Sequence, residues 1–179
     1  MSLRLFAALP IPDVIAERLI GLQKGVPGAR WRPRENLHLT LRFFGEVSED
    51  VAEDLDGELA CVRAKPFEIS LKGAGSFGGA SPHALWMGVE AHPSLIMLAK
   101  ACERAARRAG LKAESRRYMP HVTMAYLNKT ELDRVKAFER RCALFKTPAF
   151  TVDRFHLYSS LPRSHEPNLY RIEAEYPLG

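Results

Sequence analysis

The stretch His-Leu-Thr-Leu at positions 38–41 is followed, 83 positions later, by His-Val-Thr-Met at positions 121–124. Each tetrapeptide belongs to a run of apolar, β-branched and aromatic residues, and these runs predict strands over residues 37–44 and 119–127. Side chains alternate between the two faces of a strand, so each histidine shares a face with the threonine two positions later. The sequence therefore predicts two strands that each present an imidazole beside a hydroxyl.

The same spacing of 83 residues relates other parts of the chain. The offset aligns early strands, helix starts and later strands of the two halves through the pairs Leu3 and Trp86, Ser48 and Glu131, and Phe67 and Phe150. This repetition indicates an internal duplication.

The two His-x-Thr motifs also indicate a site. A core strand rarely places His and Thr on one face for burial, because each polar group would need a partner.

The order of the predicted elements gives the fold class. Helical spacing predicts helices over 13–24, 48–62, 94–109 and 131–145, with Ser48 and Thr130 as caps, and alternation predicts further strands over 3–9, 67–71, 84–89, 150–158 and 169–176. Each half is thus β-α-β-α-β. We expect one bilobal α+β domain over residues 1–179, with pseudo-two-fold lobes from repeats at roughly 1–75 and 82–179. Antiparallel sheets would line a central cleft, with the motif strands facing each other across it and the helices outside.

A glycine-rich stretch lies at the junction of the two halves, over residues 73–82. Glycine-rich loops sometimes cradle phosphates, but this one lacks the G-x-x-x-x-G-K-[ST] pattern. The composition favours a hairpin or a connection between the lobes.

Composition sets broad limits on function. The chain has 179 residues, of which 46% are hydrophobic, and this suffices for a real core. A net charge of +5 favours an acidic partner such as a nucleotide or RNA. Three cysteines without a C-x-x-C pattern predict buried or half-buried free thiols in a reducing compartment. No apolar run approaches the ~20 residues of a membrane span. We expect a cytoplasmic monomer with no membrane partner.

Two imidazoles and two hydroxyls suit a displacement at a phosphodiester. Because the unperturbed pKa of His lies near neutrality, one ring can act as a base while the other acts as an acid at the same pH. One histidine would take a proton from attacking water and the other would give a proton to the departing oxygen. The hydroxyls of Thr40 and Thr123 would donate hydrogen bonds to the non-bridging phosphate oxygens.

These residues match a known family. Residues 38–45 (His-Leu-Thr-Leu-Arg-Phe-Phe-Gly), 120–124 (Pro-His-Val-Thr-Met) and 4–10 (Arg-Leu-Phe-Ala-Ala-Leu-Pro) closely resemble the 2H phosphoesterases. Within them, the best match is the RNA 2′,3′-cyclic phosphodiesterase group, also called the LigT-like or 2′-5′ RNA ligase family. Residues 155–161 and Tyr170 resemble the ending of that group, so the resemblance covers nearly the whole chain.

The resemblance implies a fold and an activity. It implies a bilobal α+β fold with both His-x-Thr motifs in a central cleft, no metal or other cofactor, and hydrolysis of the 2′,3′-cyclic phosphate of RNA or of a nucleotide to a 2′-phosphate. Some members also join RNA ends through a 2′-5′ bond. For this product we assign His38 as the general acid and His121 as the general base, and pseudo-symmetry leaves the exchanged assignment open.

The chain departs from the family at one point. Members often carry an arginine just after the second motif, where this chain has Ala125 and Tyr126. Another arginine would then have to contact the phosphate or nucleotide, and Tyr126 would stack on a base. The candidates for this contact are Arg42, Arg116, Arg117 and Arg163.

Three other interpretations stay open. The groove could bind phosphate-terminated RNA ends without turnover. The histidines could be metal ligands, although zinc or iron would want a third His, Cys or carboxylate, and both motifs supply Thr and aliphatic residues instead. The same four side chains would also serve hydrolysis of cyclic ADP-ribose phosphate or cleavage of 2′-5′ oligoadenylate.

Overall fold

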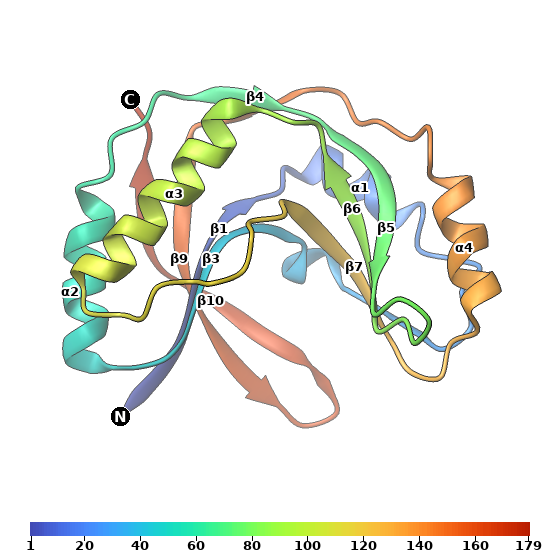
Figure 1. Cartoon of the computed structure of the whole chain (residues 1–179), viewed down its shortest axis with the longest axis horizontal. Coiled ribbons are helices and arrows are strands. Elements are labelled where there is room, and N and C mark those ends of the chain that lie inside the picture. Colours follow the sequence, from blue (N-terminus) through green and yellow to red (C-terminus); the bar gives the residue numbers. More distant parts are fainter.

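A computed structural model describes all 179 residues. Four α-helices, one 3₁₀ turn and ten strands follow one another along the chain (Figure 1). In order they are β1 (Ser2–Pro10), α1 (Asp13–Ile20), β2 (Ala29–Trp31), η1 (Arg34–Asn36), β3 (His38–Ser48), α2 (Glu49–Ala60), β4 (Phe67–Ile69), β5 (Leu71–Phe77), β6 (Ala84–Val89), α3 (Pro93–Arg108), β7 (His121–Leu127), α4 (Leu132–Arg141), β8 (Phe150–Val152), β9 (Arg154–Arg163) and β10 (Glu166–Pro177).

Most strands belong to one antiparallel sheet of eight strands. Its order is β10-β9-β1-β3-β7-β6-β5, and β2 pairs with β7 beside this path. A second, small sheet pairs β4 with β8. Helices α2 and α3 lie together at one end of the molecule and α4 at the other, while β9 and β10 form a long hairpin (Figure 1). The predicted α+β class, with antiparallel sheets and helices outside, is confirmed.

The pairing of strands reveals a local two-fold axis. In the large sheet Leu39 of β3 lies opposite Val122 of β7, and in the small sheet Glu68 lies opposite Thr151. Both pairs are separated by 83 positions, the repeat spacing of the sequence. When equivalent residues of two antiparallel strands face each other, the strands are related by a two-fold rotation at that point. The two repeats are therefore related by a two-fold axis that passes between β3 and β7 and between β4 and β8.

The motif strands meet in a way that the sequence did not predict. We expected them to face each other across a groove, but β3 and β7 are neighbours in the same sheet. Three further elements cross the predicted boundary between lobes. Helix α3 comes from the second repeat and packs on β3 and α2, while β9 and β10 extend the sheet beyond β1. The elements of the two repeats thus interleave in space.

Alternation along the motif strands divides core from surface as predicted. Leu39, Leu41, Val122 and Met124 are buried, with at most 3% of each exposed. Helix α3 buries one stripe against this layer, through residues spaced three and four apart. Each fully buried leucine contributes about 1.5–3 kcal/mol. Since the helices cover this face of β3, the histidines and threonines of the motifs point to the opposite face.

Of the local predictions, one cap is confirmed and several element bounds are wrong. Helix α1 ends at Ile20 rather than Lys24. Ser48 caps α2 as expected, accepting a hydrogen bond from the backbone N–H of Val51. Thr130 does not cap α4, because its hydroxyl donates to the carbonyl of Pro27 instead. The long terminal strand predicted over 150–158 is interrupted, and its first part pairs with β4.

The glycine-rich stretch is a hairpin. Residues 71–77 form β5, which pairs with β6, and the turn follows. A side chain at Gly75 would meet the ring of Trp86 at 2.2 Å, so this position requires glycine.

All three cysteines are free thiols, and Cys61 is exposed, contrary to our expectation of buried or half-buried thiols. None of the helices is both long and apolar enough to cross a membrane.

Candidate active site

The four motif side chains share one face at the centre of the sheet. Because Leu39 is opposite Val122 in an antiparallel pair, one step along each strand places His38 opposite Thr123 and Thr40 opposite His121. All four side chains are half-buried on the face that the helices leave open. The structure thus brings together the four residues that the sequence predicted as catalytic.

Both imidazoles are oriented by the same backbone contact. Nδ1 of His38 lies 2.8 Å from the carbonyl oxygen of Asn36, and Nδ1 of His121 lies 2.7 Å from that of Met119. A carbonyl oxygen only accepts hydrogen bonds, so each Nδ1 carries a proton and donates it. Neither Nε2 atom has a partner within the protein. Each Nε2 is therefore free to exchange a proton with a bound ligand.

His38 is enclosed by aromatic rings. The rings of Phe6 and Tyr170 lie 4.8 and 5.2 Å from its imidazole, and Tyr158 stacks on Phe6. Burial lowers the pKa of His38 to about 4; the hydrogen bond to the carbonyl of Asn36 opposes this, and the nearby charge of Arg32 adds to it. In the free protein His38 is therefore neutral at neutral pH.

His121 has a different aromatic neighbourhood. The edge of Phe77 from β5 meets its imidazole at 5.0 Å, and Trp86 from β6 lies 6.2 Å away. These residues belong to the hairpin that the glycine-rich stretch forms. The hairpin thus supports His121 from one side, as the aromatic cluster of β1, β9 and β10 supports His38.

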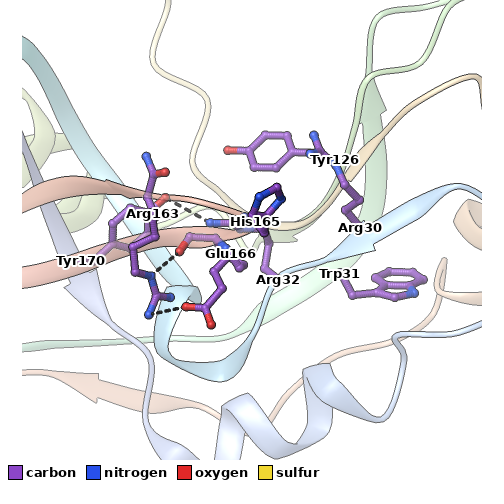
Figure 2. Close-up of a pocket in the computed structure, with 10 residues that line it drawn as sticks. Arg30, Trp31, Arg32, Tyr126, Arg163, His165, Glu166 and Tyr170 are labelled. Atoms are coloured by element: carbon purple, nitrogen blue, oxygen red, sulfur yellow. Dashed lines mark hydrogen bonds and ion pairs between the residues drawn. The ribbon is translucent and has the colours of Figure 1, made fainter.

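A cavity of about 610 Å³ opens beside His38. Its walls come from β2, β7 and the β9–β10 hairpin (Figure 2). Tyr170 lines the cavity and its ring also contacts the imidazole of His38. Three arginines make the lining positively charged, and only one acidic residue balances them. The lining residues are Arg30, Trp31, Arg32, Tyr126, Arg163, His165, Glu166, Pro167, Asn168 and Tyr170.

The predicted substrate-binding residues divide into two groups. Tyr126 and Arg163 line the cavity. Arg42 does not, because it forms an ion pair with Glu103 of α3 and donates to the carbonyl of Lys112. A register shift between β1 and β3 adds a residue to β3 just before Arg42, which breaks the alternation that would have placed Arg42 beside Thr40.

Arg116 and Arg117 also lie outside the cavity lining. Arg116 is exposed and pairs with Glu114 two residues away, which raises the pKa of the arginine. Arg117 is exposed on the same loop. Their predicted contact with the substrate, which rested on their nearness in sequence to the second motif, stays a prediction.

The most enclosed charged residue of the cavity, Arg32, is not among the residues predicted to bind substrate. It follows Trp31 of β2, whose ring packs on Phe138, while the Arg32 side chain turns into the cavity. Its position six residues before His38 was the available signal, and Arg34 shared that signal. In the structure Arg34 instead forms ion pairs with Asp13 and Glu17 of α1.

No three His, Cys, Asp or Glu side chains lie close enough together to hold a metal ion. The site offers instead two open Nε2 atoms, two hydroxyls and a positively charged cavity. Proton donors, proton acceptors and anion-binding groups in this combination define a site for acid–base chemistry on a phosphoester.

Comparison with known proteins identifies the family. Residues 11–162 match the model of the 2′-5′ RNA ligase superfamily. RNA 2′,3′-cyclic phosphodiesterase of Archaeoglobus fulgidus is 32% identical over 131 residues, which are 71% of this chain and 74% of that protein. The Aquifex aeolicus protein of the same name is 30% identical over 155 residues, covering 84% and 82% of the two chains.

A solved structure matches along almost the whole chain. Escherichia coli LigT complexed with 3′-AMP superimposes with a TM-score of 0.80 at 28% identity and covers 99% of both chains. The chain belongs to the 2′-5′ RNA ligase superfamily, as its two His-x-Thr motifs indicated.

Proposed function

We propose that the protein is an RNA 2′,3′-cyclic phosphodiesterase, which hydrolyses the cyclic phosphate of an RNA end or a nucleotide to a 2′-phosphate. The observation that carries this proposal is the convergence of His38, Thr40, His121 and Thr123 on one face, with both Nδ1 atoms bound to backbone carbonyls. The names of the relatives and the charge of the adjacent cavity support it.

The reaction is a displacement at phosphorus that needs one acid and one base. The oxygen of a water molecule bonds to phosphorus while its proton passes to Nε2 of one histidine. The bond from phosphorus to the ribose 3′ oxygen breaks, and Nε2 of the other histidine gives that oxygen a proton. Hydrogen bonds from Thr40 and Thr123 stabilise the charge on the non-bridging oxygens.

We assign His38 as the acid and His121 as the base. Tyr170 lines the cavity and contacts the imidazole of His38, so the ribose and its base would lie on the side of His38, with the leaving 3′ oxygen near that imidazole. His121 would then activate the water. Because the pKa of free His38 is about 4, its proton would be taken up together with the anionic substrate.

The cavity supports a nucleotide as the bound group. Tyr126 is 39% exposed, and its ring provides a flat surface for a base, while Arg30 and Arg163 provide positive charge for phosphates farther along an RNA chain. We propose RNA ends as the substrate class on this basis.

The site is complete within one chain, and two of the three free thiols are buried. These features support a monomer that works in the cytoplasm, where thiols stay reduced. Size-exclusion chromatography with light scattering tests the first part of this proposal, and fractionation of cells tests the second.

The deciding experiment is hydrolysis of adenosine 2′,3′-cyclic monophosphate in the presence of EDTA, with the product identified by its phosphate position. We expect adenosine 2′-monophosphate, and a rate lower by roughly 10² to 10⁴ in His38→Ala and in His121→Ala. Loss of wild-type activity on adding EDTA would favour a metalloenzyme. No turnover of this substrate or of a cyclic-ended oligonucleotide would leave the site as a binder of phosphate-terminated ends.

A further inference from the structure

Arg32 is a buried charge without a partner of opposite charge. Only 8% of the residue is exposed, yet none of the ion pairs of the protein includes it. Burial of an uncompensated guanidinium is costly, so buried arginines are usually paired with a carboxylate. Arg34 and Arg163 are more exposed, yet each has a carboxylate partner, since Arg34 pairs with Asp13 and Arg163 pairs with Glu166. The protein therefore provides no anionic partner for Arg32, and the guanidinium is available to an anionic ligand.

The guanidinium of Arg32 is held by two tyrosines. It lies over the ring of Tyr126 at 5.0 Å, and it donates a hydrogen bond of 3.3 Å to the hydroxyl of Tyr170 (Figure 2). The ring of Tyr170 in turn meets the imidazole of His38. A guanidinium carries five N–H donors, and only one of them is used here. The remaining donors are available to a ligand next to His38.

The placement of Arg32 matches the point where the sequence departs from its family. The arginine expected just after the second motif is replaced by Ala125 and Tyr126. Strand β2 pairs with this segment, with Trp31 opposite Ala125, and the backbone N–H of Arg32 donates to the carbonyl of Met124. Arg32 thus reaches the position beside the second motif from the neighbouring strand.

We propose that Arg32 binds the phosphate of the substrate, and that it replaces from β2 the guanidinium that β7 lacks in this chain. The inference rests on the proposed function for the identity of the anion. Tyr126 then has two roles, since its ring supports the guanidinium on one face and remains partly exposed to the cavity. The electrostatic effect of Arg32 on His38 agrees with this position close to the reacting group.

The first test compares the binding of two ligands to Arg32→Met. The ligands are adenosine 2′-monophosphate and adenosine, which differ only in the phosphate, and their affinities are measured by calorimetry. A hydrogen bond to a charged group is worth about 1.5–3 kcal/mol, so we expect the nucleotide to bind about ten- to a hundredfold more weakly and adenosine to be unchanged. A merely structural role would weaken both ligands equally, and that result would overturn the inference.

The matched control is Arg34→Met, in which an arginine of the same segment is removed from its ion pairs with α1. We expect the control to keep the wild-type affinity for the nucleotide and the wild-type KM for adenosine 2′,3′-cyclic monophosphate. Equal values for the two variants would overturn the role of Arg32. If the wild type binds the nucleotide through Arg32 but hydrolyses no cyclic phosphate, the proposed activity fails while the anion site stands.

The second test moves the guanidinium to the other strand. The double variant Arg32→Val, Tyr126→Arg restores an arginine just after the second motif. We expect it to recover most of the preference for adenosine 2′-monophosphate over adenosine that Arg32→Val loses, because stacking of the base on Tyr126 affects both ligands alike. A double variant with a wild-type circular dichroism spectrum and a preference as low as that of Arg32→Val would contradict the replacement.

Discussion

The two motif strands have the same backbone geometry but different surroundings. In both histidines the Nδ1–H group donates a hydrogen bond to the carbonyl two residues earlier, and the two residues that carry these carbonyls are 83 positions apart. His38 is enclosed by Phe6, Tyr158 and Tyr170, next to Arg32, whereas His121 meets the edge of the β5–β6 hairpin.

The difference shows how a symmetric pair can take up unequal roles. The duplication supplies two equivalent imidazoles, and acid–base catalysis needs two that differ in protonation. Strand β5 begins 83 positions before β9 and takes the equivalent place on the side of β7, but β10 has no counterpart there, so Tyr170 lies only beside His38. Strand β10 is thus the element that makes the two halves of the site unequal.

The largest predicted effect separates the two histidines by chemistry. We expect the loss in His38→Ala, roughly 10² to 10⁴ in rate, to be mostly recovered on a cyclic substrate with sulfur in place of the ribose 3′ oxygen. A thiolate leaves without being protonated, so it does not need the acid. His121→Ala should show no recovery, because water still needs a base. Recovery in His121→Ala alone would exchange the two roles.

The low pKa of His38 predicts a pH dependence of stability. Between pH 6.5 and about 4 the unfolded chain binds a proton at this residue and the folded protein does not, so stability falls as the pH falls. One pKa unit corresponds to about 1.4 kcal/mol, which sets the effect at up to about 3 kcal/mol.

The measurement is urea unfolding of the wild type and of His38→Gln at several pH values. The free energy of unfolding of the wild type minus that of His38→Gln should fall by up to about 3 kcal/mol as the pH is lowered from 6.5 to about 4. A difference that is constant with pH would show that the enclosure of His38 does not shift its protonation.

The threonines test the symmetric part of the site. Thr40→Val and Thr123→Val keep the shape of the side chain and remove one donor to the phosphate. We expect kcat to fall about tenfold or more in each variant, by similar factors, because the register places the two hydroxyls equivalently. A loss confined to one variant would mean that the phosphate sits asymmetrically between the strands.

The smallest predicted effect concerns the link between the hairpin and the cavity. Tyr170→Phe removes the hydrogen bond to Arg32 and keeps the ring against His38. The hydroxyl only positions the guanidinium of Arg32 and does not itself bind the phosphate, so we expect KM to rise a few-fold with little change in kcat. A large fall in kcat with KM unchanged would assign the hydroxyl to the chemical step.

The sequence by itself determined which four side chains form the proposed catalytic group. His38 and Thr40, like His121 and Thr123, are two positions apart, and the alternation of a strand alone places each pair on one face. The repeat spacing predicted the two-fold relation, and the register confirms it at Leu39 and Val122. These features depend on local geometry, which short-range periodicity encodes directly.

Only the tertiary structure decided which arginine reaches the cavity. Arg42 follows the alternation in sequence, but a register shift turns it toward Glu103 of α3. Arg32 reaches Tyr170, which lies 138 positions away, because β2 pairs with β7 and the β9–β10 hairpin extends the sheet beyond β1. The order of strands in a sheet results from the packing of the whole chain, and the periodicity of single segments carries no information about it.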